Sequence, residues 1–162
     1  MSNTESRLAD LEQRLQKVED ELAIHNLMVS YGFAADTGDA ERVAERFAEE
    51  GVYDVEGVST MEGREGVKGM ILGPNHQSLI PNCGHTVGPL AVKVDGDKAV
   101  AIGYSRTYSR IGDEIKLWRL AYNYTDLERR DGRWQILRRK NRMAGHEQAG
   151  ALFRDGLAAL EQ

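Results

Sequence analysis

The stretch AVKVDGDKAVAIGYSRTYSRIGDEIKLWRLAYNYTDLERRDGRWQI, residues 91–136, decides the fold class of this sequence. Apolar and aromatic residues alternate in it with polar ones, which is the pattern of strands with one buried face. The turn signals Asp95-Gly96-Asp97, Gly112-Asp113 and Arg130-Asp131-Gly132 separate the alternating runs, and short turns of this kind join antiparallel neighbours. The stretch therefore predicts a meander of long antiparallel strands, the last running from Trp134 to about Met143.

Upstream of the meander, the chain has the pattern of helices. Steps of three and four residues predict a long amphipathic first helix, whose apolar stripe is formed by Leu8, Leu11, Leu15, Val18 and Leu22. Beyond Leu22 the helical spacing goes on, so the helix either continues or kinks around residues 22–24, and the cap and turn residues Asp36-Thr37-Gly38-Asp39 end it. The stripe is too short to predict a coiled coil by itself, so we expect it to pack on its own subunit or on a neighbouring one.

A second helix and a short strand are expected next. Asp39 is a good N-cap for a helix from Ala40 to Glu50, and Gly51 suits the position just after it. The run Val52 to Val55 then alternates as a strand, with Tyr53 on the same face as Val55.

Further along, Gly63 opens a short helix that Gly73-Pro74 ends. The following loop, Asn75 to Pro81, carries His76, which we expect to be solvated unless the loop covers a cavity. The tail from Gln148 to Leu160 has helical spacing and predicts a closing helix, packed on the sheet or on a partner subunit. The reading is one α+β domain spanning residues 1–162, with helices on one face of a curved sheet.

Composition narrows the classes of function. A net charge of −5 argues against a nucleic-acid partner, because phosphate binding needs a basic face. The single cysteine, Cys83, cannot form an internal disulfide, which fits a reducing compartment, and we expect a cytoplasmic protein. We expect no membrane partner, because no apolar run reaches the length of a membrane span.

The chemistry-bearing residues do not have the spacing of a metal site. The histidines, at positions 25, 76, 85 and 146, show no ligand motif, and Cys83 has no neighbour that would activate it. His85 becomes a candidate general base if a carboxylate lies beside it. Asp36 either belongs to a polar turn or places a carboxylate at a helix end. Tyr31, Tyr53, Tyr104 and Tyr108 either reach a pocket or pack in the core.

The order of several features resembles the SnoaL-like branch of the NTF2-like superfamily, across roughly residues 8 to 145. The features, in chain order, are Tyr31-x4-Asp36-Thr-Gly-Asp, Phe47, Val52-Tyr53-Asp54-Val55, Gly63-Arg-Glu-Gly66, His85 before a strand, and Glu128-Arg-Arg-Asp-Gly-Arg-Trp134-Gln-Ile136. Within that branch the chain is most similar to the dehydratase-type members, the scytalone dehydratase, bile-acid dehydratase and hexachlorocyclohexane dehydrochlorinase group.

The resemblance implies a cone-shaped fold, with helices over the concave face of a curved sheet enclosing a pocket, and often a homotrimer. It implies no metal and no organic cofactor. The catalytic His-Asp dyad of the branch falls on His85 and Asp36, and Tyr31 matches a residue that assists proton transfer. An arginine near the end of the last strand falls on Arg139 or Arg142. The branch's pocket tyrosine aligns with Val55 here, for which Tyr53 is a possible substitute.

These expectations give a hypothesis of function. The chain is expected to be a cofactor-independent lyase or isomerase acting on a small, largely apolar molecule with a hydroxyl or carbonyl group. The expected substrate-binding residues are Tyr53, Leu27, Met28, Tyr104, Tyr108, Trp118, Arg139 and Arg142. The alternatives are a polyketide cyclase or ketosteroid-type isomerase, and a non-catalytic module that binds a small ligand.

Overall fold

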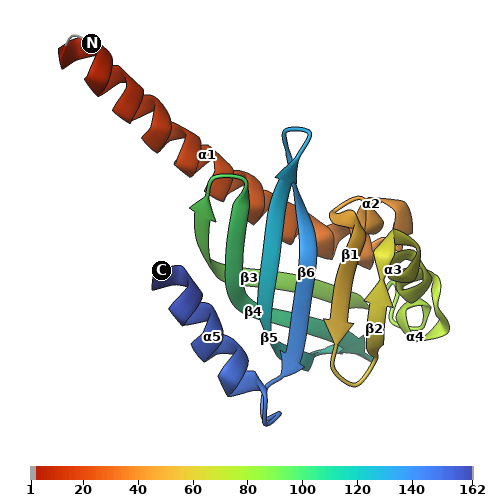
Figure 1. Cartoon of the computed structure of the whole chain (residues 1–162). Helices are drawn as coiled ribbons and strands as arrows, with labels where there is room; N and C mark the ends of the chain where they lie inside the picture. Colours follow the sequence, from red (N-terminus) through yellow and green to blue (C-terminus); the bar gives the residue numbers. More distant parts are fainter. Residues whose placement is uncertain (1–2, 162) are drawn as a thin grey trace.

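A curved six-stranded sheet forms the body of the protein in the computed structural model, which describes residues 3–161 (Figure 1). The strands are β1 (Phe47–Val55), β2 (Ser59–Glu62), β3 (Cys83–Asp95), β4 (Lys98–Ile111), β5 (Glu114–Arg130) and β6 (Arg133–Met143). They lie in the order β2-β1-β6-β5-β4-β3, and β3 to β6 form the predicted antiparallel meander. Strand β1 pairs parallel to β6, which makes the sheet mixed. The α+β class and the meander are confirmed.

Helices lie on both faces of the sheet. They are α1 (Asn3–Asp36), α2 (Ala40–Ala44), α3 (Gly63–Leu72), α4 (Pro74–Gln77) and α5 (Ala149–Glu161). On β5, Thr125 is fully buried on the concave side, whereas the adjacent Tyr124 lies beside Gly156 of α5. Because neighbouring residues of a strand point to opposite faces, α5 covers the convex face. The expectation that all helices share one face is therefore wrong for α5, although its predicted packing on the sheet is confirmed.

Helix α1 is continuous and has two halves with different surroundings. Its C-terminal half packs Ile24, Met28, Tyr31 and Ala35 into the core, with the spacing of one helix face. Buried Asp20 holds α1 in place against the sheet, because its Oδ1 accepts hydrogen bonds from Trp134 Nε1 at 2.9 Å and from Arg129 Nη1 at 2.6 Å.

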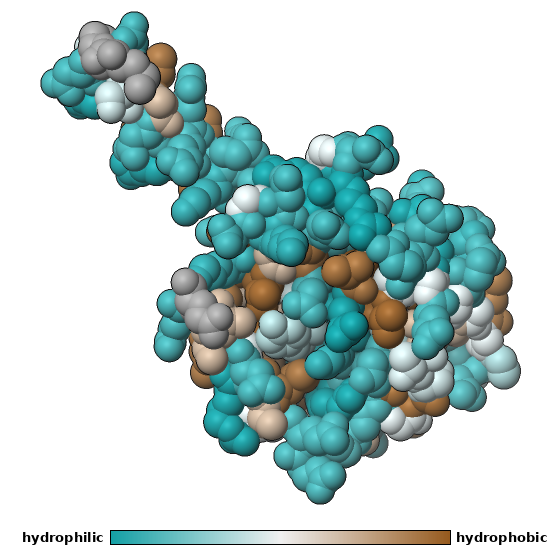
Figure 2. Space-filling view, in the orientation of Figure 1, coloured by the Kyte–Doolittle hydropathy of each residue, from teal (hydrophilic) through white to brown (hydrophobic). Residues whose placement is uncertain are grey.

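The N-terminal half of α1 projects away from the sheet (Figure 1). Its apolar stripe is exposed in the described chain, at 57% for Leu8, 55% for Leu11, 58% for Leu15, 62% for Val18 and 59% for Leu22. Hydrophobic side chains interrupt the hydrophilic surface of this projecting segment (Figure 2). The stripe thus does not pack on its own subunit.

The predicted second helix is too long. Helix α2 ends at Ala44, and Phe47 and Ala48 begin β1, where Phe47 pairs with Ile136 of β6. Phe47 and Ala48 are both buried. Together with the apolar residues of α2 they have the spacing of one helix face, although they belong to the strand that follows the helix. Gly51 lies within this strand, where a Cβ would approach Ile136 O to 2.8 Å, rather than after a helix.

Among residues 3–161, no helix is both long and apolar enough to cross a membrane.

Candidate active site

The end of α1 and the start of β3 bring Asp36 and His85 together. Oδ1 of Asp36 lies 2.6 Å from His85 Nδ1, and Oδ2 accepts a hydrogen bond from the His85 backbone N–H at 2.9 Å. The close approach of α1 to β3 depends on Gly32, because any Cβ there would clash with the His85 carbonyl oxygen. The two side chains are only 23% and 19% exposed, so water screens their interaction weakly.

Asp36 is held in its ionised form. Burial disfavours the charge, but hydrogen bonds from the His85 ring, from the His85 backbone and from Cys83 lower the pKa of Asp36 below its ordinary value of 3.8. A carboxylate facing Nδ1 assigns the ring proton to Nδ1, which leaves the lone pair of neutral His85 on Nε2. A histidine in this state can accept a proton from a bound molecule.

The lowered pKa of Asp36 predicts a pH dependence of stability. The contribution of Asp36 is fully present above the ordinary carboxyl pKa and is lost as pH falls through the lowered folded-state value. We therefore expect the free energy of unfolding to fall more steeply below pH about 4 in the wild type than in Asp36→Asn. Urea denaturation at a series of pH values measures both slopes, and equal slopes would contradict the assignment.

Cys83 completes the cluster. Its Sγ lies 3.6 Å from Asp36 Oδ1, and burial, together with the Asp36 charge, raises the pKa of the thiol to about 11. The donor atoms of Asp36, Cys83 and His85 lie within 4.8 Å of one another, which is close enough for a metal ion. However, the thiol keeps its proton and the Nδ1 proton points to the carboxylate, so the three groups fit a hydrogen-bonded cluster better than a ligand set. A metal-independent site stays a prediction.

A cavity of about 470 Å³ adjoins this cluster, between the concave face of the sheet and α3 and α4. His85, Thr86 and Val87 of β3 line one side. The remaining walls combine apolar residues with a few polar ones, and they include Tyr31, Tyr53, Val55, Met61, Met70, His76, Leu79, Ser105, Thr107, Trp118, Arg119, Arg139 and Asn141. A concave and largely apolar site with a few polar groups is typical of small-molecule binding.

Arg139 is a buried charged residue that lines this cavity. It is 1% exposed, and its guanidinium carbon lies 4.6 Å from the ring centre of Tyr31 and 4.8 Å from that of Tyr53. Its Nε donates to Asn123 Oδ1 at 3.0 Å, whereas Nη1 is buried without a partner among the described residues. Arg139 can therefore donate a hydrogen bond to an oxygen of a bound molecule.

Tyr31 offers a second donor. Burial, with a smaller contribution from Tyr53, raises the pKa of its hydroxyl well above the ordinary value, although the Arg139 charge opposes the shift. The hydroxyl keeps its proton at neutral pH and can donate to an oxygen of the ligand.

Five of the predicted site residues line the cavity, namely Tyr31, Tyr53, His85, Trp118 and Arg139. Asp36 contacts one of them, His85. Of the two candidate arginines, only Arg139 reaches the cavity, because Arg142 Nη2 pairs with Asp54 Oδ2 at 2.6 Å on another surface.

Four predicted lining residues lie elsewhere. Met28 is fully buried and Leu27 packs against the core, and neither residue lines the cavity. Tyr104 points to the convex face, where its ring centre lies 5.2 Å from that of Phe153 in α5. Tyr108 follows the cavity residue Thr107 on β4 after a register shift in the pairing with β5, and it does not line the cavity.

His76 is buried and lines the cavity with its neighbours Pro74 and Asn75, so the alternative in which this loop covers a cavity holds rather than the solvated one. It is 9% exposed, its Nε2 donates to Ala35 O at 2.8 Å, and its ring stacks on that of His85 with centres 5.6 Å apart. Burial lowers the pKa of His76, although the hydrogen bond to Ala35 opposes the shift, and this favours the neutral ring. Pro74 at the first helical position is the sequence signal for the short helix α4 that holds it.

The polar floor of the cavity was missed too. Ser105 Oγ accepts hydrogen bonds from Asn123 Nδ2 at 2.9 Å and from Asn141 Nδ2 at 3.2 Å, and Asn123 Oδ1 also accepts from Asn141 at 3.1 Å. The available signal was the alternation of β4, which places Ser105 and Thr107 opposite the tyrosines.

Comparison with known proteins places this geometry in a family. The model of the SnoaL-like domain matches residues 16–140. An NTF2-like protein of cystatin-like fold from Novosphingobium aromaticivorans is 35% identical, with 90% of this chain and 96% of that chain covered and a TM-score of 0.86. No curated protein matches the chain.

Two enzyme-like structures share the fold at lower identity. A candidate scytalone dehydratase from Novosphingobium aromaticivorans is 18% identical, with 78% of this chain and 85% of that one covered and a TM-score of 0.68. Hexachlorocyclohexane dehydrochlorinase from Novosphingobium barchaimii is 24% identical, with 83% and 90% covered and a TM-score of 0.68. At these identities, the likeness shows the fold alone.

Proposed function

We propose, because the chain belongs to the SnoaL-like domain family, that it is a cofactor-independent lyase of the dehydratase type, or an isomerase. The substrate is a small molecule with a carbonyl and, for elimination, a hydroxyl group. The observation that carries the proposal is the short His85–Asp36 contact at the wall of the cavity, because the carboxylate orients the imidazole and stabilises the imidazolium that forms on proton transfer.

The residues divide the reaction between them. His85 Nε2 takes a proton from the carbon next to the carbonyl, and the electron pair of that C–H bond moves toward the carbonyl oxygen. Asp36 stabilises the imidazolium that forms, while Arg139 and Tyr31 donate to the developing oxyanion. The electron pair then forms the C=C bond and expels the hydroxyl, which leaves as water with the proton from His85. In an isomerisation, the proton returns to another carbon instead.

A cyclase or ketosteroid-type isomerase is the first alternative, since the same base and oxyanion donors would serve it. Mass analysis of the product separates the two. Loss of water identifies a dehydratase, whereas a product of unchanged mass identifies an isomerase.

A non-catalytic binding module is the alternative from another class. It is supported if a ligand of the cavity binds His85→Ala as tightly as wild type and no turnover is found. A rate that depends on His85 contradicts it.

The exposed stripe of α1 supports a homo-oligomer, with a trimer favoured by the resemblance. A second copy of the chain is its proposed occupant, because the heptad-like spacing of the stripe is self-complementary. We expect Leu11→Ser with Leu15→Ser to shift the sedimentation coefficient to that of a smaller species. Gln13→Ser with Gln16→Ser, on the other side of the helix, is the matched control. An unchanged sedimentation coefficient for the leucine variant would remove α1 from the interface.

A further inference from the structure

The walls of the cavity carry an unbalanced positive charge. Arg119 and Arg139 both line it, and none of its lining residues is an aspartate or glutamate. The chain as a whole is acidic, with a net charge of −5. Other arginines, such as Arg130 and Arg142, pair with carboxylates, whereas the two cavity arginines form no ion pair with a described residue. An anion is therefore the complementary ligand.

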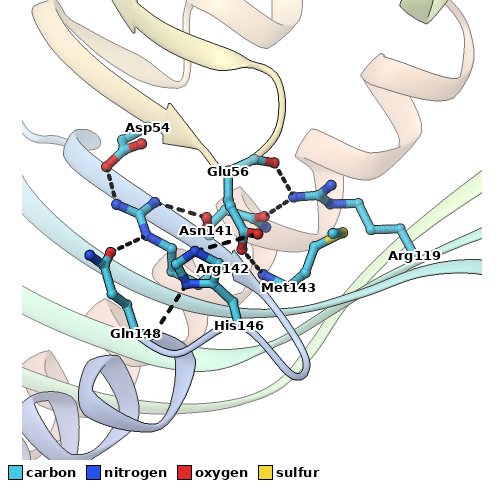
Figure 3. A network of polar contacts seen from close by, with 8 residues as sticks. All are labelled: Asp54, Glu56, Arg119, Asn141, Arg142, Met143, His146 and Gln148. Carbon is cyan, nitrogen blue, oxygen red and sulfur yellow. Dashed lines mark hydrogen bonds and ion pairs between the residues drawn. The ribbon is translucent and has the colours of Figure 1, made fainter.

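Arg119 is held in place by neutral oxygens (Figure 3). Its Nη2 donates to Glu56 O and to Asn141 Oδ1, both at 2.8 Å. These bonds orient the guanidinium but leave its charge uncompensated. The N–H groups of Nε and Nη1 have no acceptor among the described residues, so each of them can donate to one oxygen of a ligand.

Buried Arg139 points independently to a ligand that carries an acceptor oxygen. The residue is 1% exposed, and its Nη1 has no hydrogen-bond partner among residues 3–161. A buried charge with an unmet donor costs free energy, which a ligand oxygen offsets. Asn123 and Asn141 connect the two arginines, because Asn123 Oδ1 accepts from both Arg139 Nε and Asn141 Nδ2.

The sheet register places Arg119 two strands away from His85, the proposed base. His85 pairs with Thr107 on β4, and Thr107 pairs with Arg119 on β5. Two strand spacings separate the Cα atoms of His85 and Arg119 by about 10 Å. Both residues line the cavity, so a molecule of moderate length can contact both at once.

We propose that the substrate is a carboxylic acid whose carboxylate binds Arg119 while Arg139 binds the reacting oxygen. The assignment rests on the proposed function of this cavity and narrows its substrate class. A carboxylate fits Arg119 because its negative charge complements the unpaired guanidinium, and a hydrogen bond between two charged groups is stronger than one between neutral groups. The exposed Trp118 ring next to it on β5 provides an apolar wall for the body of the molecule.

Binding of matched acids and amides tests this assignment without any turnover. The probes are benzoate, phenylacetate and 3-phenylpropanoate, each with its primary amide, titrated calorimetrically into the full chain at neutral pH. We expect the best acid to bind wild type about tenfold more tightly than its amide, because a charge-assisted bond is replaced by a neutral one. Arg119→Gln should lose that preference, and Arg119→Lys should keep part of it.

The controls separate charge recognition from other effects. Arg138→Gln removes the same charge from an exposed position of β6 and should keep the preference for acids. His85→Ala should keep it as well, because binding of the carboxylate does not need the base. Thermal unfolding shows whether Arg119→Gln and Arg119→Lys are equally stable. If Arg119 had a purely structural role, the preference for acids would not depend on whether the substituted side chain is charged.

Three outcomes would overturn the assignment. They are equal binding of acids and amides by wild type, no binding of any acid at millimolar concentration, and a preference for acids that survives in Arg119→Gln. If wild type prefers acids but His85→Ala does not lower turnover, the carboxylate site is supported and only the proposed reaction is rejected.

Discussion

Replacing His85 by alanine is expected to lower the turnover number on a substrate of the cavity by about 10² to 10⁴, the usual contribution of a positioned general base. The residue lines the cavity, and its contact with Asp36 leaves Nε2 as the basic nitrogen. Steady-state kinetics at neutral pH provide the measurement. The KM should change less, because the imidazole is small relative to the lining of the cavity.

A histidine outside the cavity provides the control for this substitution. His25 lies on α1 and does not line the cavity, so His25→Ala should keep the wild-type turnover number. If both alanine variants turn over at the wild-type rate, His85 is not the base.

Asp36→Asn is expected to lower the turnover number to a similar degree. The amide keeps the shape of the side chain but cannot stabilise a positive charge on His85, so the imidazolium formed by proton transfer becomes less favourable. Asp39→Asn is a matched control three residues later. Asp39 caps α2 through a hydrogen bond from Arg42 N–H at 3.0 Å, and asparagine caps a helix equally well. If Asp36→Asn turns over at the wild-type rate, the Asp36 carboxylate has a purely structural role.

The two substitutions should not be additive. Because Asp36 acts through His85, the double variant is expected to lose about as much activity as His85→Ala alone. Independent losses that multiply would show that the two residues contribute separately.

Local patterns predicted most of the sheet and the end of α1. The meander follows from alternation between turn signals, since each strand pairs with its neighbour in sequence. The element that sequence reasoning misread lies where a helix passes directly into β1, because Phe47 and Ala48 satisfy both a helical and a strand spacing. Only the parallel pairing of Phe47 with Ile136 decides between the two, and that pairing joins segments far apart in the chain.

The candidate site was predicted only in part, again because contacts between segments far apart in the chain decide its geometry. The series of motifs singled out Asp36 and His85, but nothing local indicated that Gly32 allows the two elements to approach. Arg119 has an ordinary position in an alternating strand. Its neutral environment depends on Asn141 of β6 and on the turn after β1, which are contacts that no short-range pattern encodes.

The most direct test of the central claim is deuterium exchange at carbon. A panel of β-hydroxy ketones, with and without a carboxylate, would be incubated in D₂O and followed by proton NMR. Wild type and His25→Ala are expected to remove the signal of the hydrogen next to the carbonyl of at least one compound, while His85→Ala and Asp36→Asn leave it intact. Equal exchange in His85→Ala and wild type, or no exchange by wild type across the panel, would contradict proton abstraction by the His85–Asp36 pair.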